Sequence, residues 1–534
     1  MLNLDGIWEF AWTESASETP RYDSFAAVPG CFDAAGLRFN RRGIGWYRRR
    51  IALDGGRKRL KIASFGLHAK VFLDGEEAAE SYLAWSPLTV DFTAGAGEHE
   101  LVIRTDNFIE GHPLFKDRYD FYGFGGIFDH VTLSEVTPRE IRRLEVLPLD
   151  HVTGEILLRI ETDAPVLTIS FDGGPEQHFE NARELHLQVP DFKVWSPEHP
   201  FLHTVRINER VEEFGIRTLE WSGPRLKLNG KEIELLGVNR HESHPEFGAA
   251  TPESLIASDL LRIRQAGLNF IRGSHYPQRE YFFRMCDRLG LLVWEEPLSW
   301  GNTAEELEVP RFMDTLALQL EETIRNSFNH PSLIIHGFLN ECASDTDAGI
   351  AAVSRLMKIC HAIDPTRPAT FACNRPLRDR CFELADIAAM NVYPGWYGED
   401  DVSALPARLE EFSRLCPEKP KVISEIGAGA ILSCHSEAPY VPWSEEFQAE
   451  YTVSVLRSVL ENPRWSGVML WQFCNANTFT GTVFKTGRPR GFNNKGLLDE
   501  YRRPKLAWNA LKDVIRQWNE RENPAIRNIR KNER

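Results

Sequence analysis

The sequence lacks the cysteine patterns that build disulfide frameworks or structural zinc sites. Its nine cysteines are odd in number, lie scattered between Cys31 and Cys474, and include no Cys-x-x-Cys pair. A disulfide-rich secreted scaffold and a zinc module are therefore both disfavoured. The segment from Met1 to Phe10 has no basic stretch followed by an apolar core, so no signal peptide is expected. We expect a cytoplasmic protein with reduced thiols.

Long apolar runs and an excess of basic residues are also missing. No apolar run approaches the ~18 residues of a membrane-spanning helix. The 62 Lys and Arg residues are outnumbered by 77 Asp and Glu residues, which gives a net charge of −15. Nucleic-acid phosphates and anionic lipid surfaces are bound by clustered Lys and Arg. We therefore expect neither nucleic acid nor a membrane as a partner.

Several catalytic motifs are absent as well. The chain has no Gly-x-Ser-x-Gly, the nucleophile turn of many serine hydrolases. The cluster Gly123–Gly126 has no helix pattern after it, unlike a phosphate-binding turn. His241 and His244 are spaced differently from the zinc-binding His-Glu-x-x-His helix. Metal binding by His241, His244 and His275 stays open, but hydrogen bonding is favoured, and no metal or cofactor is expected.

The composition is that of a folded protein with several domains. The 534 residues are 42% hydrophobic and 26% charged, which leaves apolar material for more than one core. Residues 1–137 contain short apolar runs between Gly, Asp and Pro turns, which predicts an antiparallel sandwich. Residues 138–221 repeat this pattern on a smaller scale, as in Ile156–Ile160 and Val166–Phe171. The turn at Ser222-Gly-Pro marks the boundary that follows.

From residue 222 onward, short apolar strands alternate with amphipathic segments such as Pro252–Ala266 and Arg311–Phe328. The eight predicted strands are Ile233–Val238, Leu268–Arg272, Leu291–Glu295, Leu333–Leu339, Ala369–Cys373, Ile387–Val392, Lys421–Ser424 and Val468–Phe473. Eight β–α units predict a (β/α)8 barrel over residues 222–534. The alternative, an open doubly wound sheet, would want a glycine-rich turn after its first strand. The polar, basic tail Arg521–Arg534 is interpreted as a solvated end.

Polar side chains gather where these strands end, which is where barrel enzymes carry their active sites. Glu341 follows the fourth strand and Glu425 the seventh. A glycosidic bond is cleaved by two carboxyl groups, one protonating the leaving oxygen and one stabilising or trapping the sugar cation. The alternative is that either glutamate is a buried ion-pair partner of a barrel arginine. Two such residues, with Asn340 directly before one, favour catalysis.

Five segments together resemble glycoside hydrolase family two, which contains β-galactosidases, β-mannosidases and β-glucuronidases. They are Gly237-Val-Asn-Arg-His-Glu, Gly273-Ser-His-Tyr-Pro, Leu339-Asn-Glu341, Ile423-Ser-Glu425-Ile-Gly and Tyr501-Arg-Arg-Pro-Lys505. Val28-Pro-Gly30 and the segment from Asp120 to Ile127 are similar to the family's first domain. The resemblance covers nearly the whole chain. It implies a jelly-roll β-sandwich, an immunoglobulin-like β-sandwich and a C-terminal TIM barrel, in that order.

The resemblance also implies roles for individual residues. It implies Glu341 as acid/base and Glu425 as nucleophile. Asn340 would bind the sugar 2-hydroxyl, and Tyr393 would contact the nucleophile. Because the first step needs a protonated Glu341, we expect its pKa to be raised by burial and by the charge of Glu425.

The predicted substrate-binding segments are most similar to those of β-glucuronidases. Asn493 and Lys495 match the Asn-x-Lys pattern that holds the sugar carboxylate in those enzymes, and a C6 hydroxyl would need neither group. The pocket residues that the resemblance implies are Asp120, His241, Asn340, Tyr393, Tyr397, Trp471, Asn493 and Lys495. Arg488 and Arg490, just upstream, either assist with the carboxylate or are solvated.

The leading hypothesis is a retaining exo-β-glucuronidase that hydrolyses terminal β-D-glucuronides by double displacement. One alternative is a β-galactosidase or another exo-β-glycosidase of the same family, in which the Asn-Asn-Lys turn is only structural. The other is a non-catalytic carbohydrate-binding protein, against which the pair Glu341 and Glu425 argues. The expected partner is a small-molecule or oligosaccharide β-glycoside. The protein is also expected to be a homo-oligomer.

Overall fold

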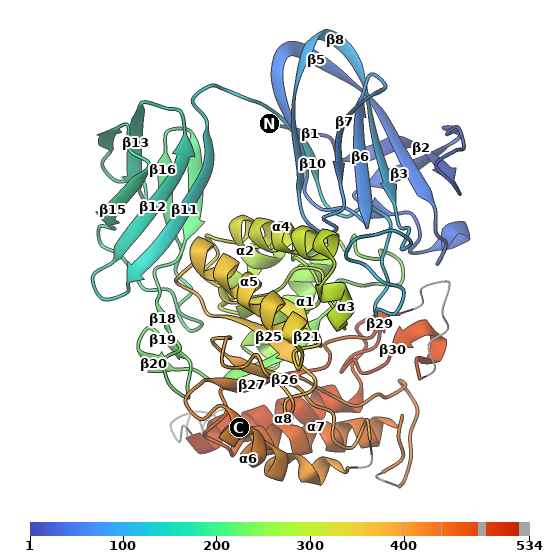
Figure 1. The fold of residues 1–534 in the computed structure, drawn as a ribbon, viewed down its shortest axis with the longest axis vertical. Coiled ribbons are helices and arrows are strands. Elements are labelled where there is room, and N and C mark those ends of the chain that lie inside the picture. The colour runs from blue at the N-terminus through green and yellow to red at the C-terminus, as the bar shows by residue number, and fades with distance from the viewer. Residues whose placement is uncertain (399, 439, 479–486, 523–534) are drawn as a thin grey trace, which may run out of the picture.

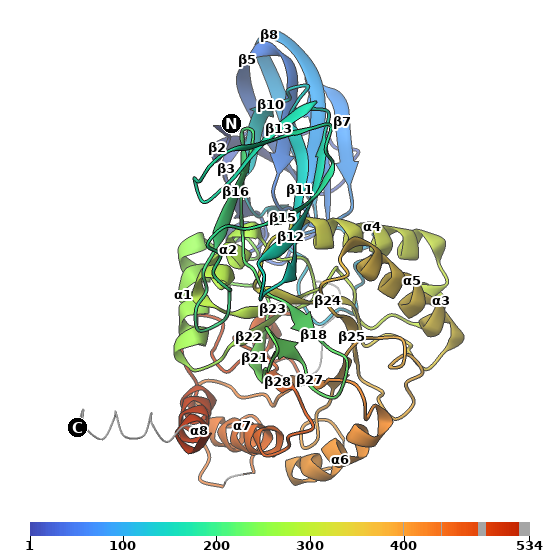
Figure 2. The same ribbon diagram turned by 90° about the vertical axis from the view of Figure 1, so that its left-hand side faces the viewer.

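The computed structural model describes residues 1–398, 400–438, 440–478 and 487–522. Two β-sandwiches lie on the same side of a closed eight-stranded barrel, as Figure 1 and the rotated view in Figure 2 show. This confirms the multidomain fold class predicted from the sequence. The predicted solvated tail lies, from residue 523 on, outside the described residues.

The first sandwich is built around two long strands, β5 (Ile44–Ile62) and β8 (Leu88–Asp106), which pair antiparallel along their whole length. Gly55 has a φ of 84° near the middle of this pair, an angle that glycine adopts without a Cβ clash. The other strands of this part are β1 (Leu2–Asn3), β2 (Gly6–Thr13), β3 (Ser24–Val28), β4 (Gly30–Cys31), β6 (His68–Leu73), β7 (Glu76–Ser81), β9 (Gly126–Ile127) and β10 (Val131–Glu135). A short 3-10 helix, η1 (Gly36–Arg38), follows β4.

The second sandwich consists of two antiparallel sheets with the strand orders β11-β12-β15 and β14-β13-β16-β17. Their strands are β11 (Ile141–Asp150), β12 (Glu155–Thr162), β13 (Val166–Phe171), β14 (Gln177–Glu180), β15 (Glu184–Gln188), β16 (His203–Ile207) and β17 (Arg210–Phe214). Ile156 and Leu158 from one sheet and Leu167 and Ile169 from the other share one apolar core. The alternation seen in the sequence therefore places alternate side chains between the sheets.

The barrel closes because β21 pairs in parallel with both β22 and β28. Its strands are β21 (Leu235–Arg240), β22 (Phe270–Gly273), β23 (Leu292–Glu295), β24 (Leu333–Asn340), β25 (Ala369–Cys373), β26 (Ala388–Asn391), β27 (Lys421–Ile426) and β28 (Gly467–Leu470). All eight predicted strands are present, with bounds that differ by a few residues. The last one ends at Leu470 instead of Phe473, because the backbone N–H of Gln472 donates to the carbonyl of Lys495 rather than to a neighbouring strand.

Helices surround the barrel, and some of them begin at a residue whose side chain caps the first turn. The helices are α1 (Glu253–Gln265), α2 (Glu280–Leu289), α3 (Ala304–Leu307), α4 (Pro310–Asn326), α5 (Asp347–Ile363), α6 (Leu405–Leu415), α7 (Glu445–Leu460) and α8 (Leu506–Glu522), with the 3-10 helices η2 (Val402–Ala404) and η3 (Pro489–Gly491). Thr346 and Ser444 cap α5 and α7 by accepting backbone N–H groups with their hydroxyls. A small hairpin, β29 (Ala476–Asn477) and β30 (Phe492–Asn493), follows β28.

One of the eight expected β–α units has no helix. The connection from β25 to β26, residues 374–387, contains no α-helix. It includes Pro376, and the carboxylate of Asp379 accepts the backbone N–H groups of Cys381 and Phe382. These bonds hold a compact loop in place of a helix at the C-terminal end of the barrel.

A small antiparallel sheet closes the opposite, N-terminal end of the barrel. Its strands β18 (Leu219–Glu220), β19 (Lys227–Leu228) and β20 (Lys231–Glu232) span the predicted boundary after residue 221. Leu219 and Leu228 pack with Leu235 and Phe270, the first residues of two barrel strands. The domain bounds 1–137, 138–221 and 222–534 stay predictions.

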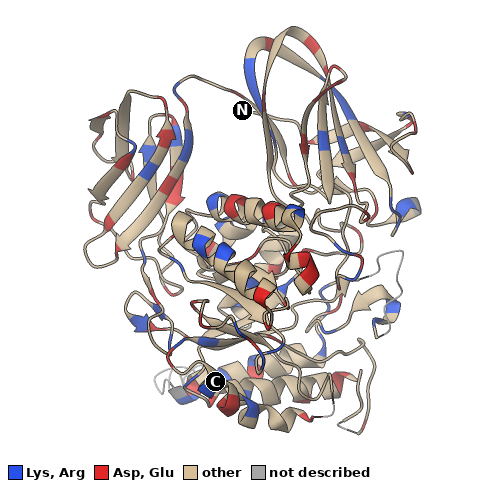
Figure 3. Cartoon of the chain, in the orientation of Figure 1, with Lys and Arg blue, Asp and Glu red and all other residues tan. Residues whose placement is uncertain are grey.

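Charges of both signs are spread over the described part of the chain. Figure 3 shows Lys and Arg interspersed with Asp and Glu over both sandwiches and the barrel. All nine cysteines are free thiols. Within the described residues, no helix is long and apolar enough to cross a bilayer.

Candidate active site

A cavity of about 80 Å³ lies at the C-terminal ends of the barrel strands. The predicted site residues that line it are Asp120, His241, Glu341, Tyr393, Tyr397, Glu425, Trp471, Asn493 and Lys495. The other lining residues are Phe121, His275, Trp300 and Arg488. Of the residues predicted for the site, Asn340 does not line the cavity and lies buried at the end of β24. The loop between β8 and β9 supplies Asp120 and Phe121, so the first sandwich contributes to the site.

Glu425 lies in β27 and is held by two donors. Its Oε1 accepts a hydrogen bond from Arg272 Nη1 at 2.7 Å, and its Oε2 accepts one from the Tyr393 hydroxyl at 2.8 Å. These bonds fix the orientation of the carboxylate and stabilise its charge. In the sequence analysis, a buried ion pair with a barrel arginine is the alternative role for either glutamate. Glu425 does form such a pair, with Arg272.

Arg272, in β22, connects residues of three other strands with Glu296, which follows β23. Its Nη2 donates to Asn340 Oδ1 at 2.8 Å, its Nη1 donates to Asn239 Oδ1 at 3.1 Å, and its Nε donates to Glu296 Oε2 at 3.1 Å. The guanidinium is fully buried and multiply paired, as a charge in a barrel interior must be. Sequence reasoning missed Arg272 and Glu296 as site residues. Their positions at strand ends were the signal that could have found them.

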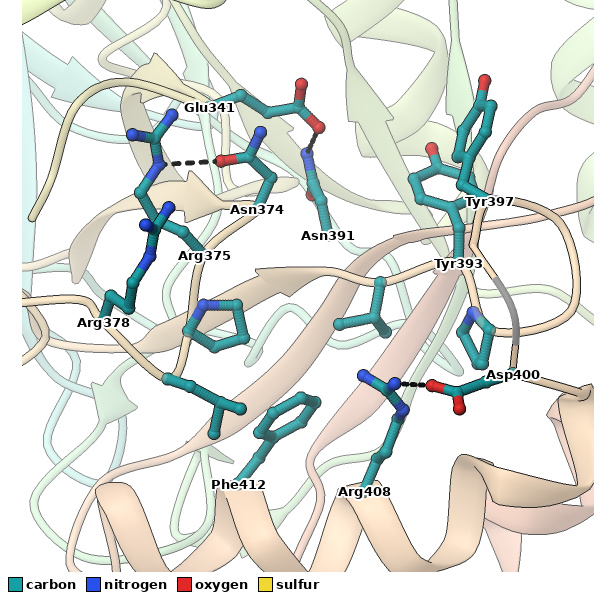
Figure 4. Close-up of a pocket in the computed structure, with 14 residues that line it drawn as sticks. Glu341, Asn374, Arg375, Arg378, Asn391, Tyr393, Tyr397, Asp400, Arg408 and Phe412 are labelled. Atoms are coloured by element: carbon teal, nitrogen blue, oxygen red, sulfur yellow. Dashed lines mark hydrogen bonds and ion pairs between the residues drawn. The ribbon is translucent and has the colours of Figure 1, made fainter.

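Glu341 follows β24 in a strained backbone conformation. Its φ is 54°, in the left-handed region that residues other than glycine rarely adopt. Its Oε1 accepts a hydrogen bond from Asn391 Nδ2 at 3.0 Å (Figure 4). Burial, and next the charge of Glu425, raise the pKa of Glu341 to about 7, as the sequence analysis predicts. A carboxyl group with this pKa can donate a proton near neutral pH.

Three buried nitrogen atoms at the site are left without a hydrogen-bond partner among the described residues. They are Asn340 Nδ2, His241 Nε2 and His275 Nε2. Burial is the main cause that lowers the pKa of His275 to about 3 and that of His241 well below its usual value. Both rings are therefore neutral and can donate or accept at Nε2. Because an unpaired buried polar group is costly, these atoms favour a ligand rich in hydroxyl groups.

Trp471 forms an aromatic wall beside these histidines. Its ring stacks on His275 with 5.3 Å between ring centres and an angle of 21°, and meets His241 edge-on at the same distance. Phe121 packs against both histidines from the first sandwich. Flat apolar faces beside polar atoms suit a sugar ring, whose C–H faces and hydroxyls need both.

Lys495 is a buried cation at another wall of the cavity. It is 3% exposed, and its Nζ donates to the Tyr397 hydroxyl at 2.6 Å. The ammonium lies 4.7 Å from the centre of the Tyr397 ring and 5.5 Å from that of Trp396. Burial, followed by the charge of Arg488, lowers the pKa of Lys495. Its partner here is a phenol rather than a carboxylate, so an anionic ligand group would relieve its desolvation.

Asp120 and Asn493 are joined to Arg488 beside this lysine. Arg488 Nε donates to both carboxylate oxygens of Asp120 at 3.0 Å, and Asn493 Nδ2 donates to Asp120 Oδ2 at 3.0 Å. Arg488 Nη2 also donates to the Tyr397 hydroxyl at 3.2 Å. Of the two alternatives for Arg488, the structure places it in the pocket rather than in solvent.

The turn that carries Lys495 is held from beneath. Lys505 Nζ donates to the carbonyls of Ala430 at 2.7 Å and Asn494 at 2.9 Å. Arg490 pairs with Glu500 at 2.7 Å and does not line the cavity. Arg490 is therefore neither in the pocket nor simply solvated, and its ion pair adds to the support of the turn.

The histidines considered as metal ligands make other contacts. Among the described residues, no group of three or more His, Cys, Asp or Glu side chains is placed to hold a metal ion. His244 stacks on Phe247 with 4.8 Å between ring centres. The His241 and His275 rings meet edge-on, 5.4 Å apart.

The chain forms an eight-stranded parallel barrel, and two glutamates line a cavity at the C-terminal end that suits a sugar ring. This combination defines a glycoside hydrolase. Residues 220–519, more than half of the chain, match the TIM barrel domain of glycosyl hydrolases family 2, and the chain belongs to this family. The alternative of a non-catalytic carbohydrate-binding protein is therefore wrong.

Relatives of known structure or curated name cover nearly the whole chain. A beta-glucuronidase of Streptococcus agalactiae is 25% identical, and the alignment covers 97% of this chain and 96% of that protein. The crystal structure of a GH2 beta-galacturonidase from Eisenbergiella tayi bound to galacturonate is 32% identical, with a TM-score of 0.88 and 97% of each chain covered. A beta-glucuronidase of Faecalibacterium prausnitzii is 26% identical, with a TM-score of 0.87 and 97% of each chain covered.

Proposed function

We propose that this protein is a retaining exo-β-glucuronidase. Glu425 attacks the anomeric carbon while the bond to the leaving oxygen breaks and Glu341 gives that oxygen its proton. Glu341 then takes a proton from water, whose oxygen attacks the anomeric carbon and breaks the ester bond to Glu425. Asn340 binds the 2-hydroxyl, a contact that strengthens in the transition state.

The electrostatics of the two glutamates support these roles. Arg272 and Tyr393 stabilise the negative charge of Glu425 before attack. Glu341 has a pKa raised to about 7 by burial and then by Glu425, so it carries a proton to donate. Once Glu425 is esterified, its charge is gone, and the pKa of Glu341 falls, as a general base requires.

The buried ammonium of Lys495 is the observation that carries the substrate proposal. It lies in the same cavity as both glutamates and is bonded to the Tyr397 hydroxyl. A C6 carboxylate would supply the anionic partner, and Asn493 and Arg488 lie beside it. A neutral sugar offers no such partner, which favours a uronide over a galactoside or glucoside.

A β-galacturonidase is a second candidate. The relative with 32% identity is a beta-galacturonidase bound to galacturonate. Glucuronate and galacturonate carry the same C6 carboxylate and differ in configuration at C4. Lys495 can therefore bind the carboxylate of either sugar. The preference for one of them depends on the side chains around the 4-hydroxyl.

The test measures kcat/KM on p-nitrophenyl β-glycosides: glucuronide, galacturonide, galactoside, glucoside and mannoside. Lys495→Ala is expected to lower kcat/KM on the preferred uronide roughly 30-fold. This corresponds to about 2 kcal/mol of lost transition-state stabilisation, the scale of a charge-assisted hydrogen bond. The glucoside is the matched control, because it has the same ring without the carboxylate. Preference for a neutral sugar, with Lys495→Ala silent, would refute the uronide assignment and leave the other exo-glycosidases of the family.

Two further expectations belong with this proposal. A homo-oligomer can be tested by light scattering at several protein concentrations. A cytoplasmic location is supported by the nine free thiols, which persist where glutathione keeps cysteines reduced.

A further inference from the structure

A second, larger cavity of about 520 Å³ adjoins the sugar cavity. The two share Glu341, Tyr393 and Tyr397 as lining residues. The rest of the larger wall comes from the helix-free β25–β26 loop, the segment after β26 and helix α6 (Figure 4). We call it the outer cavity.

The position of Glu341, the proposed acid, indicates which part of the substrate enters the outer cavity. The leaving oxygen must lie within hydrogen-bond reach of Glu341. The sugar side of Glu341 is occupied by the cavity that holds His241, Trp471 and Lys495. The group attached to the leaving oxygen therefore extends to the other side of Glu341, into the outer cavity.

The β25–β26 loop gives this cavity an excess of positive charge. Arg375 and Arg378 share one carboxylate, Asp345, with N···O distances of 2.9 and 3.7 Å. The neighbouring Asp379 does not line the cavity and is used by backbone N–H groups of its own loop. Neither Asp345 nor Asp379 lines the cavity, so the loop presents two guanidinium groups and no carboxylate to it.

The other charged groups of the outer cavity are already matched. Arg408 forms an ion pair with Asp400, across the cavity from Arg375 and Arg378 (Figure 4). Glu341, with its pKa near 7, is not a strong counter-charge. The side chain of Arg378 is 72% exposed, against 26% for Arg375, so Arg378 is free to turn toward a ligand.

Apolar side chains supply the remaining surface. Phe412 is buried and Leu377 is 55% exposed, although both line the cavity. Pro376, Val392 and Pro394 also line the cavity. An apolar surface of this kind packs against a ring, while the arginines bind an anion at its edge.

We infer that the outer cavity binds leaving groups that carry an anionic substituent, a carboxylate or a sulfate, with Arg375 and Arg378 as the specificity-determining residues. This inference rests on the proposed function, since it assigns the leaving-group side of the same reaction. The anionic group can come from an acidic sugar residue of a glycan or from a small acidic aryl alcohol. Both present a ring with an anion at its edge.

The experiment compares substrates whose leaving groups have similar shapes but are either anionic or neutral. One arm uses 4-sulfophenyl and 4-sulfamoylphenyl glycosides of the preferred uronic acid, in which the sulfonate stands for the anionic group and the sulfonamide is its neutral counterpart. The other arm uses disaccharides in which that uronic acid is linked to an acidic or a neutral sugar. The measured quantity is the ratio of kcat/KM on the anionic to that on the neutral partner. The intrinsic reactivity of each leaving group is the same for every variant, so it cancels when this ratio is compared between variants.

The double variant Arg375→Gln/Arg378→Gln is expected to lower this ratio about fivefold, the scale of two partly exposed ion pairs. Arg378→Glu keeps Arg375 and its bonds to the loop, and is expected to lower the ratio further while the protein stays folded. Arg355→Gln, which loses an exposed ion pair to Asp314 between α4 and α5, is the matched control and leaves the ratio unchanged. Added salt should lower the wild-type ratio.

A shift in either arm supports the inference and identifies the source of the anion. An unchanged ratio in both arms, with folded variants, overturns it. Wild-type hydrolysis of the neutral-partner uronides reports separately on the proposed function. If these substrates are not cleaved at all, the function fails first; if they are cleaved and the ratio does not move, only the leaving-group inference fails.

Discussion

The two ends of the barrel use burial in opposite ways. At the N-terminal end, Leu219 and Leu228 pack on Leu235 and Phe270 to give an apolar seal. At the C-terminal end, the strands bury charged groups, and nitrogen atoms such as Asn340 Nδ2 are left unpaired among the described residues. One end is built for stability and the other for binding, which is the division expected of a barrel enzyme.

This difference also explains why the buried charges at the C-terminal end are hydrogen-bonded to one another. A lone buried charge is expensive, so Arg272 is bonded to Glu425, Glu296, Asn340 and Asn239 at once. The same network gives Glu425 a fixed orientation. Lys495 Nζ, in contrast, donates to the neutral hydroxyl of Tyr397. We expect this of a cation that binds an anionic ligand.

The largest expected effect is at the functional end. Glu425→Gln should lower kcat by about 10⁴-fold or more, because the nucleophile is lost while the rest of the site remains. Binding of a uronic acid and the circular dichroism spectrum should be retained, and these measurements separate lost chemistry from lost folding. Unchanged turnover would contradict the role of Glu425.

An effect of intermediate size is expected at the apolar end. Leu228→Ala should lower the free energy of unfolding by about 2–5 kcal/mol, through lost burial and the cavity left behind. Activity well below the melting temperature should be unchanged. Leu261→Ala, at a half-exposed position of α1, is the control and should change stability little. If Leu228→Ala altered KM on the native-like protein, the division between the two ends would be wrong.

The smallest expected effect is the pH dependence of the wild-type rate near neutrality. Glu341 acts first as an acid and has a raised pKa of about 7, so its protonated fraction falls as pH rises through that value. The kcat/KM profile should therefore decline on the alkaline side near pH 7. Glu341→Gln should abolish that decline along with most of the rate. A decline that survives in the variant would have to come from another group.

The sequence predicts most of the fold because the physical patterns are local. Buried parallel strands appear as apolar runs, and all eight were found, including the two that carry Asn340 and Glu425. The missing helix between β25 and β26 was not predicted, because the loop depends on Asp379 accepting backbone groups two and three residues away, a pattern also common at helix starts.

The site could be predicted less completely than the fold. Motif resemblance pointed to residues that line the cavity, such as Asp120 and Lys495, which lie far apart in the sequence. It missed Arg272, because an arginine at a strand end has many possible partners and only the closed barrel brings Glu425 and Asn340 to it. It also left Arg488 undecided, since its contact with Asp120 crosses from the barrel to the first sandwich.

The most direct test of the central claim is to trap the glycosyl-enzyme. The protein is incubated with 2-deoxy-2-fluoro-β-D-glucuronyl fluoride, which slows the second step, and is analysed by intact mass and peptide mapping. The account predicts one added fluoroglucuronyl group on Glu425 and much slower labelling by the corresponding glucosyl fluoride. A label on another residue, or equal labelling by the neutral sugar, would contradict it.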